Sequence, residues 1–382
     1  MRPVEGVELG AQMKTADIRR TSQWAIAGCA LAVSCLMFLL GGCAWVGLTL
    51  GALTYPTTQP GESANVVANG NWAYVTRGAA GIEILHLGAA TSSTLMRLPH
   101  DVESADDLAI ADDLLFVLDA RPQGHLSVFS LTTPSAPALV GTPIAVEVGP
   151  FSGVSAAAGR VIVSGGTSQL SLRSYDAAGR LGAAVVSADY GRGQPDVLLD
   201  SRGELALIST HNWGPYFRLT LARVSGSPLS LAEQGSLPLD TYGFTPGGAE
   251  PANFPIESAI AGQHAYVAFN KGLGVLDVSS PKAPKQVALL KLDVEPVNVD
   301  VQDGVAAMVG SQPKPMLILV DVRDAPNPKV LQSLPLPEGS FATGVALTPA
   351  YVIVAAHGKG SLLFDRSKGA WEHIDHTDVL PP

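Results

Sequence analysis

The chain has 382 residues, of which 47% are hydrophobic and 15% are charged, a balance that excludes a disordered protein and allows a large core. Its formal net charge is −10, and because an acidic surface repels phosphate backbones, we expect no nucleic-acid partner. The 40 glycines and 28 prolines are spread along the chain, which suits many short strands joined by turns.

The first predicted element is an N-terminal membrane segment. No charged residue occurs between Arg20 and Glu62. Residues 24–50 are mostly apolar and would span about 40 Å as a helix, against a hydrocarbon core of about 30 Å. Basic residues precede this run, so we expect residues 1–23 to stay in the cytoplasm and the rest to be exported. Residues 24–54 are thus predicted to be a transmembrane anchor or a lipoprotein-type signal, and residues 55–62 a linker.

The sequence "LLGGC", which ends at Cys43, leaves two kinds of anchor open. It resembles a bacterial lipoprotein signal, in which the cysteine is lipidated and becomes the new N-terminus; two acyl chains would anchor it stably. The apolar run continues beyond Cys43, which favours an uncleaved helix. Cysteine is absent after this position, so residues 63–382 are predicted to fold without disulfides or thiolate metal sites.

The remainder of the chain repeats one phrase of about 44 residues. Its copies align on a position at the end of an apolar strand, and the steps between copies are 44, 44, 49, 54, 44 and 44 residues. A fixed period with two insertions is typical of a repeat architecture. The aligned positions are Leu87, Leu131, Tyr175, Val224, Val278, Val322 and Arg366.

Each copy reads as four short strands without helical periodicity. A polar and an aliphatic residue open the first strand, a tight turn leads to an apolar second strand, and a third strand ends at the aligned position. A proline-containing turn, as in "VSSPKAPK" from Val278, then leads to a weaker fourth strand. Four strands per unit predict a β-propeller blade, and seven units predict an all-β, seven-bladed and monomeric β-propeller over residues 63–382.

The sequence "GQHAYVAFNKGLGVLDVSSPKAPKQVALL", from Gly262 to Leu290, resembles the LVIVD repeat of bacterial and archaeal surface proteins. The likeness is also good in the first, second and sixth units and looser in the other three. It implies a propeller on an exported protein of the bacterial cell envelope, and it implies no particular reaction.

The first candidate site is a column of polar residues that open the predicted innermost strands, which line the channel of a propeller. Carboxylate and amide oxygens that converge there could bind a hard cation such as Ca²⁺, which needs six to eight oxygens. The alternative is that they face channel water or cap strand ends, and then no cofactor is needed. The candidate metal ligands are Asn65, Asp107, Asp196, Glu257 and Asn298, and the same position is Gly153 in the third unit.

The second candidate site lies on the two insertions of the repeat. One joins the second and third strands of the fourth unit, and the other joins the fourth and fifth units, so in an antiparallel blade both leave from the same face. They carry six aromatic residues, which predict either a binding surface or a small cluster packed on itself. These residues are Trp213, Tyr216, Phe217, Tyr242, Phe244 and Phe254.

Two classes of function follow from these sites. The first is a non-enzymatic, membrane-anchored scaffold that presents the aromatic residues to an envelope protein or a glycan outside the cytoplasm. The second is a metal-dependent hydrolase or lactonase that uses the channel carboxylates. A quinone-dependent dehydrogenase is a third reading, but the repeated tryptophan motif of that propeller group is absent. Whether the protein is an enzyme stays open at this point.

Overall fold

The computed structural model describes residues 65–88, 92–121, 124–146, 152–164, 169–187, 194–211, 218–238, 255–269, 272–357, 359–365 and 371–374. The chain divides into two compact units, residues 1–57 and 58–382, and all described residues belong to the second. In this described part, no helix is long and apolar enough to cross a membrane. The helix predicted over residues 24–54, and Cys43 within it, lie outside the described residues.

The first three blades follow one another along the chain. Blade 1 comprises β1 (Val66–Asn69), β2 (Trp72–Thr76), β3 (Ile82–His86) and β4 (Ser92–Met96). Blade 2 comprises β5 (Asp107–Ala111), β6 (Leu114–Asp119), β7 (His125–Ser130), β8 (Ala138–Leu139) and β9 (Ile144–Ala145). Blade 3 comprises β10 (Val154–Ala157), β11 (Arg160–Ser164), β12 (Leu170–Ser174) and β13 (Val185–Val186).

Four more blades complete the described chain. Blade 4 comprises β14 (Gln194–Leu199), β15 (Leu205–His211), β16 (Arg218–Ser225) and β17 (Ser230–Pro238). Blade 5 comprises β18 (Pro255–Ala261), β19 (His264–Phe269), β20 (Gly272–Asp277) and β21 (Lys285–Lys291). Blade 6 comprises β22 (Glu295–Gln302), β23 (Val305–Gln312), β24 (Met316–Asp321) and β25 (Lys329–Pro335). Blade 7 comprises β26 (Phe341–Leu347), β27 (Tyr351–His357), β28 (Gly360–Asp365) and β29 (Glu372–Ile374).

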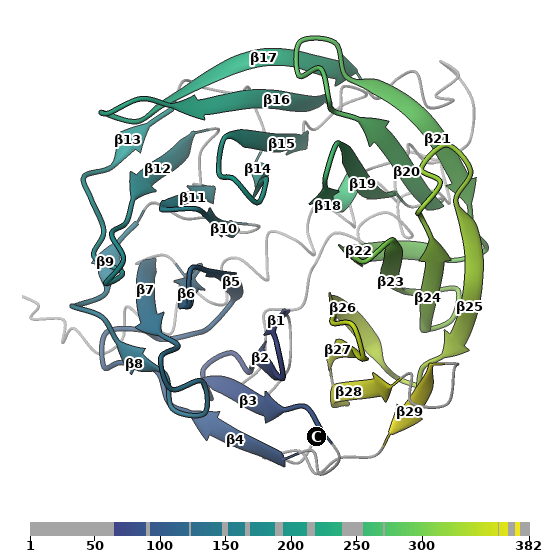
Figure 1. The fold of residues 1–382 in the computed structure, drawn as a ribbon. Helices are drawn as coiled ribbons and strands as arrows, with labels where there is room; N and C mark the ends of the chain where they lie inside the picture. The colour runs from purple at the N-terminus through teal and green to yellow at the C-terminus, as the bar shows by residue number, and fades with distance from the viewer. Residues whose placement is uncertain are drawn as a thin grey trace, which may run out of the picture. The chain divides into compact units, whose positions relative to one another are not determined.

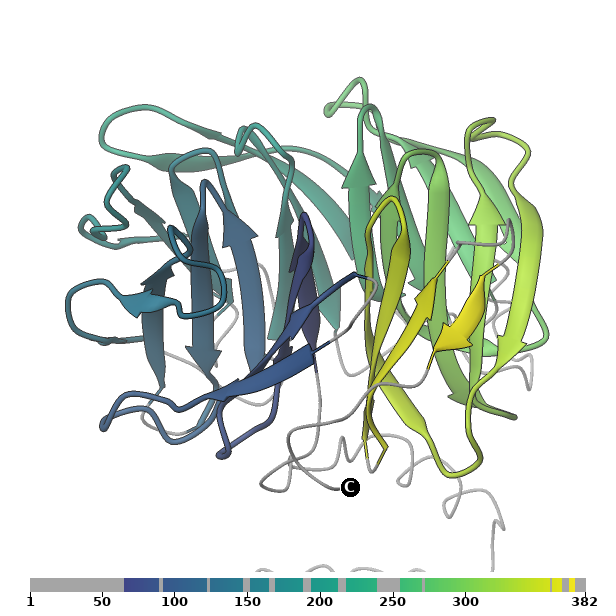
Figure 2. The same cartoon turned by 60° about the horizontal axis from the view of Figure 1, so that its bottom comes forward.

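These sheets form a ring of seven antiparallel blades, which confirms the predicted propeller. In each blade the strands run outward in chain order, and the first strand of every blade lies nearest the centre (Figure 1). Figure 2 shows the same ring turned so that its bottom comes forward. The outer strand of blade 2 is divided, because β8 and β9 both pair with β7. Gly141 and Pro143 lie between these two pieces, and proline cannot donate a hydrogen bond to a ladder.

The turn between the third and fourth strands supports the preceding blade. The Tyr74 hydroxyl of blade 1 donates a hydrogen bond to the Pro134 carbonyl oxygen in this turn of blade 2, at 3.0 Å. The same turn of blade 5 packs closely on blade 4, because a Cβ placed on Gly235 would lie 2.6 Å from the Pro281 carbonyl oxygen. The repeated proline-containing phrase therefore forms a turn that also packs between blades.

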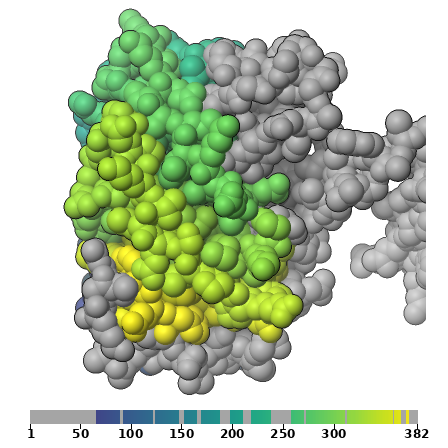
Figure 3. Space-filling view, turned by 90° about the vertical axis from the view of Figure 1, so that its right-hand side faces the viewer, coloured from purple at the N-terminus to yellow at the C-terminus, as the bar shows by residue number. Residues whose placement is uncertain are grey.

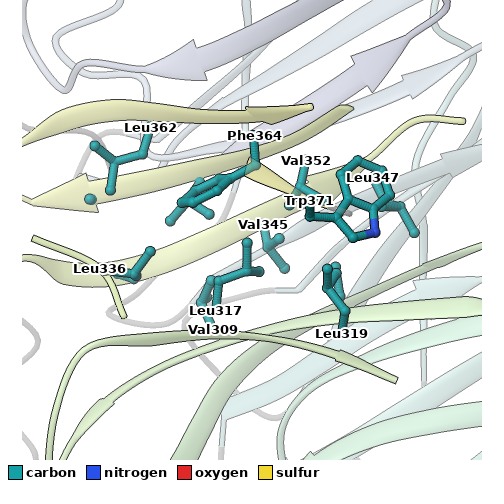
Figure 4. Close-up of a cluster of buried hydrophobic side chains, with 14 residues drawn as sticks. Val309, Leu317, Leu319, Leu336, Val345, Leu347, Val352, Leu362, Phe364 and Trp371 are labelled. Atoms are coloured by element: carbon teal, nitrogen blue, oxygen red, sulfur yellow. The ribbon is translucent and has the colours of Figure 1, made fainter. Parts of the chain in front are cut away.

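The hydrophobic core is divided among the seven seams between neighbouring blades. Each seam holds one cluster of buried side chains, because the two faces of every sheet pack on the sheets beside it. Figure 4 shows the cluster between blades 6 and 7, where Phe364 and Trp371 lie across from Leu317 and Leu319. This arrangement explains why the second strands are apolar on both faces, because one face of each strand is buried in the seam with the preceding blade and the other face in the seam with the following blade.

The outer strands of blades 4, 5 and 6 share a β-bulge. The ladders of β17, β21 and β25 each shift register once, opposite the third strand of their blade. In blade 6 the extra residue is Leu331, which is 50% exposed. Figure 3 shows the outside of the C-terminal blades as a continuous face. Bulges interrupt the regular edge that another strand would need for pairing, so they protect this outer rim from aggregation.

Candidate functional site

The polar column predicted from the repeat lies at the innermost strands. Asp107 begins β5, Asp196 lies in β14, Glu257 in β18 and Asn298 in β22, while Asn65 and Gly153 directly precede β1 and β10. All six positions therefore lie in the first strand of a blade or directly before it. The structure describes no side-chain environment for Asp196.

Two members of the column meet across the seam between blades 1 and 2. The Asn65 side-chain amide donates a hydrogen bond to Oδ1 of Asp107. The same Oδ1 accepts the N–H of Leu108 at 2.8 Å, and Oδ2 accepts the N–H of Val154 at 2.7 Å. Asp107 thus joins its own strand to the innermost strands of both neighbouring blades. This hydrogen bonding matches the strand-capping alternative considered for the column.

The same device recurs at two positions that the repeat alignment does not select. In blade 6, Oδ1 of Asp300 accepts the N–H of Val301 at 2.8 Å and Oδ2 accepts the N–H of Leu347 in blade 7 at 2.7 Å. In blade 3, the Ser155 hydroxyl oxygen accepts the N–H of Leu199 in blade 4 at 2.9 Å. We call Asp107, Ser155 and Asp300 the inter-blade clasps.

The environment of Asp300 raises the pKa of its carboxyl group. Burial within the ring raises the pKa of this carboxyl above its ordinary value, and the hydrogen bonds from Leu347 and Val301 oppose that shift without cancelling it. The side chain keeps partial solvent exposure, on an innermost strand. A buried carboxyl with a raised pKa is often found at a functional site, but here its two oxygens hold the backbone of two blades.

Two members of the described column, Asn65 and Asp107, take part in hydrogen bonds between blades. In the part of the chain that the structure describes, no three residues of the types His, Cys, Asp and Glu are grouped so that they could hold a metal ion. Ca²⁺ needs six to eight oxygens, whereas both oxygens of Asp107 already accept backbone N–H groups. Binding of Ca²⁺ by Asn65, Asp107, Asp196, Glu257 and Asn298 stays a prediction.

The six aromatic residues of the second candidate site lie on segments 212–217 and 239–254, outside the described residues. The strands from which both segments leave are described. Arg218, at the start of β16, pairs with Thr210 of β15 on one side and with Pro238 of β17 on the other. The stems of both insertions therefore lie at the same end of the blade 4 sheet, as the antiparallel topology predicted.

The start of β16 also carries an exposed ion pair. The Arg218 guanidinium contacts Oε1 of Glu233 on β17, and both side chains are about half exposed. An exposed pair of this kind adds little stability. It does place one positive and one negative group beside the stems of the two insertions.

A model of the LVIVD repeat matches the chain at residues 60–96 and 258–288. These are the first and fifth units, two of those in which the repeat phrase is clearest, so the resemblance drawn from the sequence is confirmed. No curated protein matches the chain in sequence.

Several solved structures share the fold. A putative 6-phosphogluconolactonase from Bacteroides uniformis aligns with a TM-score of 0.58 and 11% identity, over 82% of this chain and 95% of that chain. Sqt1 from Chaetomium thermophilum, bound to the N-terminus of the ribosomal protein L10, aligns with a TM-score of 0.55 and 11% identity, over 78% and 82%. A streptogramin B lyase aligns with a TM-score of 0.53 and 12% identity, over 78% and 92%. At such identities the likeness is one of fold.

Proposed function

Because the chain is an LVIVD-repeat β-propeller, we propose that it is a non-enzymatic binding scaffold. In this proposal the aromatic side chains of segments 212–217 and 239–254 form a binding rim beside blades 4 and 5. The rim contacts a protein or a glycan of the bacterial cell envelope, and the propeller itself is a monomer. The proposed rim residues are Trp213, Tyr216, Phe217, Tyr242, Phe244 and Phe254.

The observation that carries this proposal is the position of the two stems. Arg218 pairs with both Thr210 and Pro238, so the two longest insertions of the repeat leave one sheet at one end. Loops that carry several aromatic residues on a rigid β-scaffold are a common form of binding site, because Trp and Tyr dominate the energetics of interfaces. The ring of blades supplies the rigidity, since the seams on both sides of blade 4 are filled by buried clusters.

The use of the channel carboxylates also supports a scaffold. Asp107 and Asp300 hold neighbouring blades together through backbone N–H groups. A catalytic or metal-binding carboxylate must be available to substrate or ion, whereas these oxygens are occupied by structural hydrogen bonds. This structural use of both carboxyl groups supports the scaffold over the hydrolase.

In this proposal the N-terminal segment holds the propeller at the cytoplasmic membrane. The apolar residues 24–54 would anchor the chain in the cytoplasmic membrane, with residues 1–23 in the cytoplasm and the propeller outside it. Lipidation of Cys43 is the alternative form of the same anchor. Either anchor would leave the linker 55–62 to carry the propeller at the membrane surface.

The test of the binding rim uses the immobilised full-length chain. Wild type is compared with the triple variant Trp213→Ala/Tyr242→Ala/Phe244→Ala for capture of proteins from envelope extract and for binding to a glycan array. The control is Val186→Ala, because Val186 is also a large apolar residue, 58% exposed on the outer strand of blade 3. We expect the triple variant to lose at least about tenfold in affinity for whatever wild type and the control bind. Equal binding by all three proteins would reject the rim.

The metal-dependent hydrolase is kept as the second candidate because Asn65 and Asp107 do meet beside the channel. A cation that binds only the folded state would raise the melting temperature by mass action. Metal analysis of the purified chain, and melting curves with and without millimolar Ca²⁺, test this directly. A shift that disappears in Glu257→Gln would support the metal site, and no shift together with no bound metal would reject it.

A further inference from the structure

The seam between blade 7 and blade 1 differs from the other six in its connectivity. At each of those six, the last strand of one blade leads along the chain into the first strand of the next. Blades 1 and 7 are built from the two ends of the propeller, and the sheet of each contains only strands consecutive in sequence. Among the described residues, the ring is therefore closed by side-chain packing between β1–β3 and β26–β28, without a shared strand.

This seam also differs in its chemistry. Glu83 lies on β3 four residues before the aligned position of the repeat, and its side chain is fully buried. The same position in the other blades carries a small hydroxyl residue, glycine or an aliphatic residue. Those residues are Ser127, Ser171, Thr220, Gly274, Ile318 and Leu362. Only blade 1 has a charged residue at this position.

Glu83 is held by a partner of its own blade and contacts the opposite blade. Arg77, which directly follows β2, donates to Oε2 of Glu83 through Nε at 3.0 Å and also through Nη2. Ser361 of β28 donates its hydroxyl hydrogen bond to the same Oε2 at 3.1 Å, across 278 residues of sequence. All three side chains are buried, with relative exposures of 1%, 0% and 2% for Arg77, Glu83 and Ser361.

Filling a seam with a buried ion pair has an unfavourable desolvation free energy that apolar side chains do not have. Removing two charges from water costs several kcal/mol, and apolar residues of similar volume often give equal or higher stability. Among the described residues, Oε1 of Glu83 has no hydrogen-bond partner, which adds to that cost. Buried polar groups of this kind are best attested where they fix one arrangement among several. At this seam the buried polar groups would fix how blade 1 aligns with blade 7, the first and last described blades.

We propose that Arg77, Glu83 and Ser361 form a latch that closes the ring, and that the propeller opens first at the seam this latch holds. Arg77 orients Glu83 within blade 1, and the hydrogen bond from Ser361 connects it to blade 7. Because these are the first and last described blades, no described segment links them directly, and their separation gains more chain freedom than opening any other seam. The charge-assisted hydrogen bond from Ser361 to Glu83 stabilises the closed seam and so offsets this larger gain of chain freedom on opening.

The test is hydrogen exchange of the full-length chain, read strand by strand. The variant is Ser361→Ala, which removes the contact across the seam and leaves the ion pair of blade 1 in place. The matched control is Ser155→Ala, because the Ser155 hydroxyl also bonds across a seam, to the N–H of Leu199, but there the chain connects the two blades. The measured quantity is the rate of local opening in each strand.

In wild type we expect β3 and β28 to open before the third strands of the other blades. Ser361→Ala should raise opening of β3 and β28 together, by about tenfold, the loss typical of a hydrogen bond to a charged group. Ser155→Ala should change exchange only near Leu199. The proposal is overturned if Ser361→Ala leaves β3 and β28 unchanged, or if it raises exchange equally in all seven blades.

Discussion

Asp107→Ala should destabilise the propeller by about 2–4 kcal/mol. The change removes the acceptor for three donors: the N–H groups of Leu108 and Val154 and the side-chain amide of Asn65. An unsatisfied buried donor costs about 1–3 kcal/mol, and partial access to channel water lowers that cost for each group here. The total is therefore close to one kcal/mol for each lost bond rather than the full penalty.

Denaturant unfolding of wild type and Asp107→Ala, with metal chelator present throughout, measures this difference. Asp107→Asn serves as the control, since its carbonyl oxygen can still accept one backbone N–H. We expect its loss to be roughly half that of the alanine variant. A change below about 0.5 kcal/mol for Asp107→Ala would refute the clasp, because surface substitutions fall within that range. The same curves are then repeated with millimolar Ca²⁺ in place of the chelator, and a loss seen only in that second series would show instead that Asp107 acts through a metal.

Four further outcomes are expected. Gly235→Ala should lower the unfolding free energy by about 1–3 kcal/mol, because the new Cβ would lie 2.6 Å from the Pro281 carbonyl oxygen and overpacking costs this much; denaturant curves check it. Phe364→Ala should cost about 3–5 kcal/mol by the same measurement, since this side chain is 2% exposed between blades 6 and 7. Burial raises the pKa of the Asp300 carboxyl above 3.8, so the folded protein binds a proton there more readily than the unfolded chain does. The unfolding free energy of wild type should therefore rise, relative to that of Asp300→Asn, as pH falls through the raised pKa, and it should fall as pH rises. Unfolding curves across roughly pH 4–7, the window above the ordinary pKa, check the sign. Cys43→Ser should leave the mass and the membrane association of the full-length chain unchanged if the helix is uncleaved, whereas loss of fatty-acid labelling and a larger product would identify lipidation.

The blades could be predicted because each one repeats a local pattern. The apolar second strand predicted for each unit is present in all seven blades, from β2 (Trp72–Thr76) to β27 (Tyr351–His357). The tight turn predicted before the second strand is present in blade 6 at Asp303 and Gly304, which both have a positive φ. Such signals depend on neighbours in sequence, so period and turn chemistry are sufficient to find them.

The contacts between blades could not be predicted in the same way. The sequence "DVQDG", which begins at Asp300, is typical of a hairpin turn, but Asp300 itself belongs to β22 and reaches the N–H of Leu347. Glu83 is a single acidic residue in an apolar strand, and its partner Ser361 is 278 residues away. One signal was available: Glu83 is the only charged residue at its repeat position. An exception within a repeat marks a blade with a different neighbour or a different task.

The metal ligands proposed for the channel illustrate the limit of spacing as evidence. Counting residues back from the second strands identifies Asn65 and Asp107, which do meet, but the same count misses Ser155 and Asp300. A shift of two residues along a strand keeps a side chain on the same face. Spacing therefore identifies the face that polar residues share, while the hydrogen bonds of the folded ring decide which of them are used.

The claim that the aromatic residues form a binding rim is tested most directly by the stability of single variants. Melting curves and denaturant curves of Trp213→Ala, Tyr242→Ala and Phe244→Ala need no knowledge of the ligand. If these side chains are available to a partner, each change should alter the unfolding free energy by less than about 0.5 kcal/mol. If they are buried in a cluster of their own, each should cost roughly 3–5 kcal/mol, as for a buried aromatic residue, and a loss of that size in all three would contradict the rim.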